Sequence, residues 1–375
     1  MNSIEKSRKP KIRFKGYNDD WEQRKLEEIV QITMGQSPDG STYSNEPSDY
    51  ILVQGNADLL NGWVSPRIWT TQITKKADAG DLIMSVRAPA GSMGKTAYDA
   101  VIGRGVAAIK GNEFIYQLLV KMDEVGYWKT FSCGSTFESL SSDTIKNAEV
   151  NVTLIAEQTQ IGLFLNQLDH LITLHQRKLD KLINVKKSML EKMFPKQGST
   201  VPEIRFNGFT QAWEQRKAKK LFISTADKGY PDLPVLSATQ DRGMIRRDQN
   251  SINISHDKNN ENGYKRVLPG QFVIHLRSFQ GGFAHSRIEG ITSPAYTIFG
   301  FSEPKKHDSE YWKYVFTSKE FIRRLETVTY GIRDGRSISY DEFLTLDFFF
   351  PSVEEQEKIS QYLDELTHLI TLHQR

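Results

Sequence analysis

PKIRFKGYNDDWEQRK, at Pro10–Lys25, returns as PEIRFNGFTQAWEQRK at Pro202–Lys217, with 10 of 16 positions identical. A second duplicated segment, HLITLHQR, occupies His170–Arg177 and recurs unchanged at His368–Arg375. The two offsets, 192 and 198 residues, are nearly equal, which indicates a chain built from two homologous halves. An ordinary duplication without any division of labour between the halves would leave the same traces.

The segments between these duplicated ones have diverged. GDLIMSVRAPAG at Gly80–Gly91 matches GQFVIHLRSFQG at Gly270–Gly281 in pattern more than in identity, with Arg87 opposite Arg277. A frame kept alike around two different centres predicts a common scaffold that carries two specificities.

The closing segment of the first half has the most regular apolar spacing in the chain. Intervals of three and four residues form a heptad seam through Ile161, Leu165, Leu168, Ile172, His175, Leu179 and Leu182. Pro195 and Gly198 end the pattern, which predicts a helix over about 155–194, roughly 60 Å long. Such a helix needs a partner to cover its stripe.

The second half begins an equivalent helix, whose seam residues are Ile359, Leu363, Leu366 and Ile370. The sequence stops at Arg375, so this second helix is either naturally short or cut off. We expect the two helices to pack on each other, with the shorter helix covering only part of the longer one. The alternative is two separate amphipathic helices on two globular domains.

Short apolar runs such as YILVQ, DLIMSV, AEVNVTL, QFVIHL, AYTIFGF and LDFFFP alternate with Gly, Asn, Pro and Asp clusters in the central segments. Such runs are typical of strands and turns, while residues 310–327 have helical spacing. The predicted fold class is therefore α+β, with two strand-rich domains, an internal pseudo-two-fold repeat and long helices. The predicted limits are domain one at 1–152, spacer helix one at 153–198, domain two at 199–352 and spacer helix two at 353–375.

The composition fits a folded protein of two or three domains, since 38% of the 375 residues are hydrophobic and 25% are charged. The net charge of +3 is too small to specify a partner. Residues 1–15 and 177–196, however, each carry an excess of five positive charges. Such patches suit phosphates, although solvated charge would account for either.

The single cysteine, Cys133, excludes an intrachain disulfide and is interpreted as a packed thiol rather than a nucleophile. No signal peptide is recognisable, and no apolar run reaches the roughly 18 to 20 residues of a membrane span. These features predict a cytoplasmic protein that does not associate with membranes. No metal site is predicted, because His175 and His373 are only one imidazole from each half.

The catalytic signatures that we sought are near misses. GSMGKT at Gly91–Thr96 has Pro89 where a phosphate-binding loop needs glycine, and SPAY at Ser293–Tyr296 has Ala295 in place of the second proline of an amino-methyltransferase motif. No HExxH, paired CxxC or GxSxG motif occurs. No catalytic residue is therefore predicted, and a nuclease built on scattered carboxylates has no positive evidence.

Planar and basic side chains instead occupy glycine-flanked loops beside the predicted strands. Arg donates twice to guanine, Gln and Asn pair with adenine, and Lys holds phosphate. A loop arginine is also commonly solvated or paired with a surface carboxylate. The candidate DNA-binding residues are Gln36, Gln54, Asn56, Arg87, Lys95, Arg104, Arg242, Arg246, Arg277, Gln280, Arg333 and Arg336.

Over nearly its whole length the chain resembles the specificity (S) subunits of type I restriction-modification systems. The resemblance is carried by the duplicated RFxGF/Y...WEQRK motif and the HLITLHQRKLDKL...KxxMLxKMFP helix. It extends to the run LPVLSATQDRGMIRR...VIHLRSFQGGFAHS...VTYGIRDGRSIS in the second half.

The resemblance implies a non-catalytic subunit that binds double-stranded DNA. Each half would read one part of a bipartite target. The long helices would form an antiparallel coiled coil that sets the gap and docks two methyltransferase subunits. The chain itself would bind no cofactor. S-adenosylmethionine would belong to the methyltransferase subunits, and ATP and Mg to the two motor-nuclease subunits that such a complex can recruit. The alternative is a scaffold or decoy that binds methyltransferase subunits without binding DNA.

Overall fold

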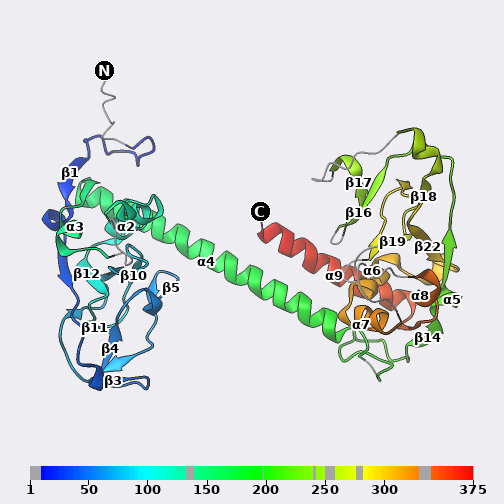
Figure 1. Ribbon diagram of the computed structural model, residues 1–375, viewed down its shortest axis with the longest axis horizontal. Coiled ribbons are helices and arrows are strands. Elements are labelled where there is room, and N and C mark those ends of the chain that lie inside the picture. The colour runs from blue at the N-terminus through cyan, green and yellow to red at the C-terminus, as the bar shows by residue number, and fades with distance from the viewer. Residues whose placement is uncertain are drawn as a thin grey trace. The chain divides into compact units, whose positions relative to one another are not determined.

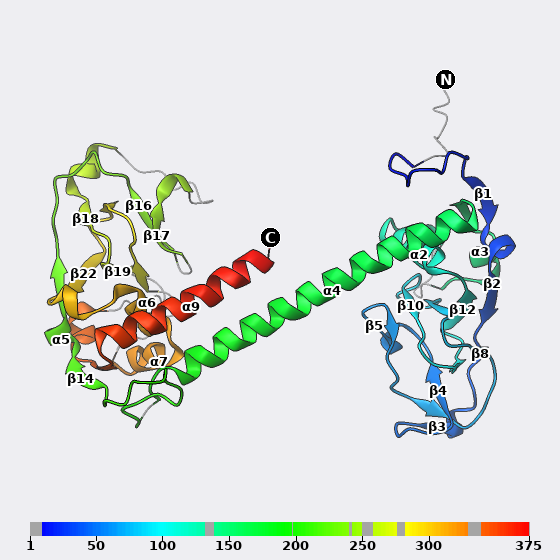
Figure 2. The same cartoon turned by 180° about the vertical axis from the view of Figure 1, so that it is seen from behind.

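The computed structural model describes residues 10–131, 139–196, 198–239, 242–249, 258–275, 282–328 and 339–374. It consists of two compact units, Met1–Thr173 and Leu174–Arg375. Helix α4 (Ile155–Lys192) begins in the first unit and ends in the second (Figures 1 and 2). Its bounds agree with the helix expected from the heptads, while the predicted domain limits stay a prediction.

In the first unit the duplicated WEQRK segment joins the start of the fold to its end. Strand β1 (Glu22–Lys25) pairs antiparallel with β13 (Glu149–Val152), with Glu22 opposite Val152. Helix α1 (Leu26–Ile29) follows at once, and the fully buried Leu26 donates its backbone N–H to the carbonyl of Ala148 (2.9 Å). The duplicated segment is thus a closure of the domain, made by backbone pairing.

Two further sheets form the body of this unit (Figure 1). One has six strands in the order β2 (Gln31–Met34), β12 (Val106–Lys110), β9 (Leu82–Ser85), β10 (Met93–Lys95), β6 (Trp63–Val64) and β5 (Leu59–Leu60). The other has five, in the order β3 (Tyr43–Ser44), β7 (Trp69–Thr70), β4 (Tyr50–Val53), β11 (Ala100–Ile102) and β8 (Lys76–Ala77). Helices α2 (Glu113–Glu124) and α3 (Ser142–Lys146) complete a largely aliphatic core.

The second unit repeats the closure around a different centre. Strand β14 (Glu214–Lys217) pairs with β23 (Asp347–Phe350), with Glu214 opposite Phe350, and α5 (Ala218–Leu221) follows. The remaining strands form one four-stranded sheet and two pairs: β15 (Phe222–Thr225), β22 (Thr297–Phe301), β19 (Phe272–Ile274) and β20 (Phe283–His285); β16 (Leu236–Thr239) with β17 (Gly243–Arg246); and β18 (Lys265–Val267) with β21 (Gly290–Thr292).

The core of the second unit is aromatic where that of the first is aliphatic. Phe222, Phe299, Phe316 and Phe343 contact one another at ring-centroid distances of 5.2–5.9 Å. The helical spacing over 310–327 corresponds to two helices, α6 (Ser309–Thr317) and α7 (Lys319–Val328), followed by α8 (Tyr340–Phe343). All six apolar runs interpreted as strands contain one, and the α+β fold class is confirmed.

Helix α9 (Val353–His373) runs antiparallel to the final part of α4, and the rings of His175 and His373 lie 5.8 Å apart. The predicted seam does more than join these helices. Ile359 and Leu363 are buried in the aromatic core of their own unit, which also includes Met193 near the end of α4. A heptad predicts that a stripe is buried and does not say against which surface.

The seam of α4 is likewise divided among surfaces. Ile161 packs on the core of the first unit, whereas Leu168 and Ile172 are 39% and 66% exposed. Leu165, Leu179, Leu182 and Ile370 are half-buried and Leu366 is buried. The apolar stripe of α4 is therefore only partly covered within the described part of the chain.

Candidate nucleic-acid interface

Glycine-rich loops of the first unit converge at the ends of four strands. Gly103, between β11 and β12, donates its N–H to the carbonyl of Val53 at the end of β4 (2.8 Å). Val86, after β9, donates to the carbonyl of Gly105 (2.9 Å). Gln36, after β2, donates to the carbonyl of Ile102 at the end of β11 (2.9 Å). The loops after β2, after β4, after β9 and between β11 and β12 are thus held together by backbone hydrogen bonds.

The close approach of these loops depends on glycine. A Cβ at Gly105 would lie 2.0 Å from the carbonyl oxygen of Gln54, and a Cβ at Gly35 would lie 2.1 Å from the carbonyl oxygen of Gly103. Neither separation is compatible with a side chain. The glycines therefore bring the side chains of neighbouring positions into one small region.

Five of the predicted DNA-binding residues belong to these converging loops: Gln36, Gln54, Asn56, Arg87 and Arg104. Gln36, Arg87 and Arg104 are exposed. Within the described part of the chain, none of the five side chains has a hydrogen-bond or ion-pair partner. Asp58 fixes one of the loops by accepting the N–H of Gln54 (2.8 Å). The backbone of this loop is therefore anchored, while the described residues supply no partner to any of the five planar groups.

Lys95 is placed differently. Its ammonium lies 3.0 Å from Oε2 of Glu113 and over the rings of Trp63 and Tyr116, at 5.0 and 4.5 Å from their centroids. Its side chain is only 13% exposed. The structure gives Lys95 an internal role that its position in a glycine-flanked loop did not reveal, and its contact with DNA stays a prediction.

In the second unit two of the candidates lie on the hairpin of β16 and β17. Arg246 forms an exposed ion pair with Asp248 (3.0 Å). Arg242 is exposed, and its side chain has no partner among the described residues. The other four candidates of this unit lie outside the described residues: Arg277, Gln280, Arg333 and Arg336.

Sequence reasoning missed the ion pairs that hold each half to its long helix. Arg13 donates to both carboxylate oxygens of Glu157 in α4 (2.6 and 2.7 Å). Arg205 makes the same bidentate contact with Glu355 in α9 (2.9 and 2.7 Å). The signal was present, because both arginines lie in the duplicated IRF motif and both glutamates precede a glutamine.

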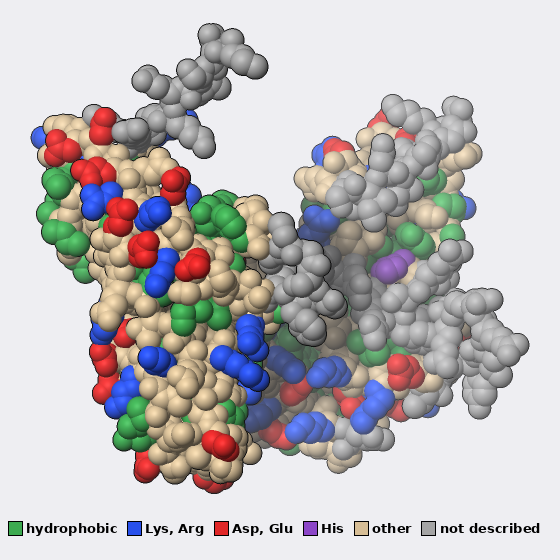
Figure 3. Space-filling model, turned by 60° about the vertical axis from the view of Figure 1, so that its left-hand side comes forward, with side chains coloured by type: hydrophobic (Ala, Val, Ile, Leu, Met, Phe, Trp, Pro, Cys, Tyr) green, Lys and Arg blue, Asp and Glu red, His purple; other side chains and the backbone are tan. Residues whose placement is uncertain are grey.

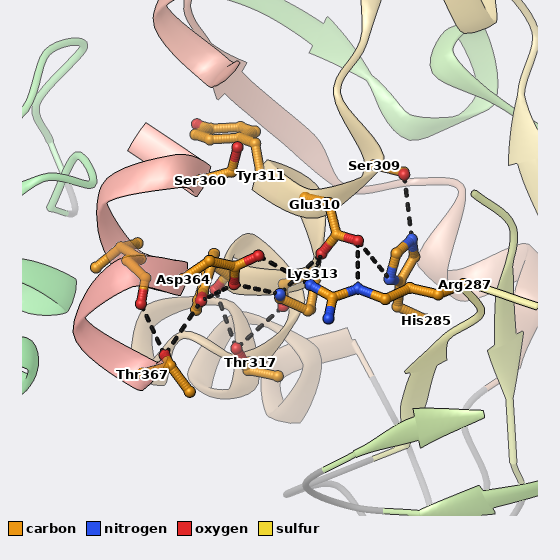
Figure 4. Close-up of polar contacts among 12 residues, drawn as sticks. His285, Arg287, Ser309, Glu310, Tyr311, Lys313, Thr317, Ser360, Asp364 and Thr367 are labelled. Carbon is orange, nitrogen blue, oxygen red and sulfur yellow. Dashed lines mark hydrogen bonds and ion pairs between the residues drawn. The ribbon is translucent and has the colours of Figure 1, made fainter. Parts of the chain in front are cut away.

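A charged network connects β20, α6 and α9 in the second unit (Figure 4). Arg287 donates to Glu310 (2.5 and 2.7 Å) and to Asp364 (2.8 Å), and Lys313 donates to the same two carboxylates (2.8 and 2.7 Å). Burial opposes ionisation of Glu310, but the hydrogen bonds from Arg287 and Lys313 outweigh it and lower its pKa to about 2. Burial lowers the pKa of the neighbouring His285 to about 4.

Acidic and basic side chains are interspersed over much of the face that Figure 3 shows. Within the described ranges, no group of three or more potential ligands comes together to hold a metal ion. None of the helices described has the length and apolar character needed to cross a membrane.

The duplicated frame around two unlike centres is the fold of S subunits of type I restriction-modification systems. The crystal structure of such a subunit from M. genitalium superposes with a TM-score of 0.57 at 12% identity, covering 96% of this chain and 93% of that one. Residues 18–184 match the model of the family described as type I restriction modification DNA specificity domain. The resemblance inferred from the sequence is thereby confirmed.

Relatives similar in sequence match about half of the chain. The putative type I restriction enzyme MjaX specificity subunit of Methanocaldococcus jannaschii is 29% identical over 182 residues, which are 46% of this chain and 42% of that protein. A chain in a structure of complex assembly and conformational transition of the type I R-M system is 30% identical, with a TM-score of 0.37, over 44% of this chain and 42% of that chain. The chain thus matches less than half the length of either relative.

Proposed function

We propose that this chain is the DNA-recognition subunit of a type I restriction-modification complex, and that each half reads one part of a bipartite target. The observation that carries the proposal is the convergence of Gln36, Gln54, Asn56, Arg87 and Arg104, whose side chains have no hydrogen-bond or ion-pair partner among the described residues. Planar donors and acceptors held on a fixed backbone suit base edges in the major groove. The family of residues 18–184 supports the same role.

The two halves differ in the domain centres that would contact bases and agree in the segments that would attach these domains to the scaffold. Matching closures, β1 with β13 and β14 with β23, surround an aliphatic core in one unit and an aromatic core in the other. Base contacts must vary with the target, whereas the frame and helices that set the gap and dock methyltransferase subunits must not. This division supports two readers on one scaffold.

In this proposal the chain directs chemistry without performing it. S-adenosylmethionine would be bound by two methyltransferase subunits, and ATP and Mg by motor-nuclease subunits where these join the complex. The role of this chain would be to place the methyltransferase active sites over adenines within its target.

Methylation sequencing tests the proposal. DNA from cells that express the chain with its cognate methyltransferase subunit is compared with DNA from cells that lack only this chain. We expect adenine methylation at a split motif that depends on the chain. A stable complex with the methyltransferase subunit that produces no new motif would instead favour a scaffold or decoy that does not read DNA.

A further inference from the structure

A pocket of about 840 Å³ lies in the second unit where the end of α4, helices α6 and α9, and strands β17 and β20 meet. Four cationic side chains and one carboxylate line it: Lys186, Arg242, Arg287, Lys313 and Asp364. We call it the basic pocket. None of its cations except Arg242 was singled out as a DNA-binding candidate from the sequence.

The carboxylates near the pocket are already engaged. Asp364 accepts hydrogen bonds from Lys313 (2.7 Å) and Arg287 (2.8 Å), and Glu310 accepts from the same two cations. Figure 4 shows the contacts that connect these four side chains between α6 and α9. Two cations and two carboxylates therefore balance, and Lys186 and Arg242 remain as an excess of two positive charges.

Lys186 lies where an ammonium is poorly compensated. It is half-buried and has no hydrogen-bond partner among the described residues. Burial lowers its pKa, and the positive charge of Lys313 lowers it further, against the attraction of Asp364. An anion bound in the pocket would relieve both unfavourable effects.

Arg242 contributes the second free donor group. It precedes β17 on the hairpin that also carries Arg246, and its guanidinium has no partner in the part of the chain that is described. The Nε and Nη2 of Arg287 make the contacts to Glu310 and Asp364, and its Nη1 has no acceptor among the described residues. Three sets of N–H donors thus line one cavity and find no acceptor in the described part of the chain.

We propose that the basic pocket binds a phosphate of the DNA backbone beside the part of the target read by the second half, with Lys186 and Arg242 as its principal ligands. The inference rests on the proposed function, because it takes the neighbouring β16–β17 hairpin to approach DNA. Arginine and lysine donors bind phosphate oxygens directly. Such a contact fixes the register of the protein on the duplex and carries no sequence information.

Salt dependence of duplex binding tests the inference. The double variant Lys186→Gln/Arg242→Gln of the full chain is compared with the unchanged chain by fluorescence anisotropy, using a duplex that contains the methylated motif and a scrambled duplex. Affinity for DNA falls as salt concentration rises, and the loss of one phosphate contact makes the slope of log affinity against log salt concentration shallower by about 0.9. We expect that decrease, and an equal loss of affinity on both duplexes.

A matched control is Lys192→Gln, which removes an exposed lysine from the same helix outside the basic pocket. The salt slope of this control variant should equal that of the unchanged chain. Circular dichroism melting should show no loss of stability in either variant, since none of the replaced groups has a hydrogen-bond partner in the described structure.

Several outcomes overturn the inference. If the unchanged chain binds duplex and the double variant has the same salt slope, the basic pocket is not a phosphate site, and the proposed function is unaffected. A loss confined to the target duplex makes these residues base readers. Stabilisation by inorganic phosphate that the variant lacks, with no change in slope, indicates a free-anion site. Loss of methyltransferase binding at unchanged slope indicates an acidic protein partner. Failure of the parent to bind any duplex defeats the proposed function together with the pocket.

Discussion

Gln356 accepts a hydrogen bond from the backbone N–H of Asp308 (3.0 Å) and donates one to the carbonyl of Pro351 (2.9 Å). The first half contains the same arrangement, since Gln158 accepts from the Asn112 side chain (3.0 Å) and donates to the carbonyl of Thr153 (2.7 Å). Each glutamine therefore ties its long helix to the N-terminal end of a helix in the recognition domain. The duplicated Glu-Gln pairs therefore form a joint, by which we mean the contacts that attach each long helix to its recognition domain.

Replacing Gln356 with leucine should destabilise the second unit. The side chain is fully buried, so the change leaves a buried N–H and a buried carbonyl without partners, at a cost of about 1–3 kcal/mol. Urea unfolding followed by tryptophan fluorescence measures the change. Gln361→Leu is the matched control, because Gln361 is exposed on the same helix. Equal midpoints for the two variants would show that the joint contributes nothing to stability.

The glycine at position 105 should be required for recognition by the first half only. Gly105→Ala forces its Cβ against the carbonyl oxygen of Gln54 and must displace that loop. In methylation sequencing we expect one part of the split motif to be lost or degenerate while the other part persists. Gly40→Ala serves as the control, since nothing lies within 4 Å of its added Cβ. An intact two-part motif in Gly105→Ala would argue against this loop cluster as a reader.

Arg104→Ala separates the two ways in which an arginine contacts DNA. A bidentate contact to a base edge contributes roughly 1–3 kcal/mol of discrimination, so the variant should relax specificity at one or two base positions. A phosphate contact would weaken binding to all sequences equally. Competition binding with single-position variants of the target distinguishes the two kinds of contact. The control is Arg24→Ala, which replaces an arginine paired with Glu28 and should change neither the base specificity nor the overall affinity.

The sequence predicted the architecture well because repeats and periodicity report on the backbone. Each duplicated WEQRK segment contains a strand that pairs with the last strand of its own unit, and the heptads of α4 correspond to a helix of 38 residues. It predicted individual side chains less well, because their partners come from distant segments. Lys95 pairs with Glu113 on a helix. Lys186 was interpreted as a position of the heptad seam and as part of a charged stretch, and it lines a pocket. Spacing along the chain does not reveal which carboxylate folds back onto which cation.

The stability of the second unit should fall as the pH drops from about 6.5 toward 4. Burial lowers the pKa of His285 in the folded state to about 4, whereas an unfolded histidine titrates near 6.5. The unfolded chain therefore binds more protons in this interval, and a contribution of about 3 kcal/mol that is fully present above pH 6.5 is lost on acidification. His307, also lowered to about 4, acts in the same direction.

Urea unfolding at pH 7.0 and at pH 5.0 measures this effect. His285→Gln should reduce the pH dependence, while the exposed His368→Gln should not. The interval between pH 6.5 and 4.5 isolates the histidines, because Glu310, with its pKa lowered to about 2 in the fold, loses its stabilising charge only below about pH 4.5. Identical pH profiles for the two histidine variants would contradict the assignment.

Lengthening α4 should lengthen the gap in the DNA target. Residues 170–178 of α4 are exposed, so an insertion after Lys178 disturbs neither the contacts of Ile161 with the first core nor those of Met193 with the second. Seven added residues extend a helix by about 10.5 Å and turn its end by only about 20°. At 3.4 Å per base pair this corresponds to about three base pairs, and the two outer parts of the motif should stay the same.

An insertion of four residues is the informative contrast, because it extends the helix by only about 6 Å and turns its end by about 40°. We expect the seven-residue insertion to give methylation at a motif with a gap longer by about three base pairs, and the four-residue insertion to methylate with lower efficiency. Methylation sequencing of cells carrying either variant reports both results. A gap identical to that of the parent in the seven-residue variant would mean that α4 does not set the spacing, and that the two readers are positioned by the partner subunits instead.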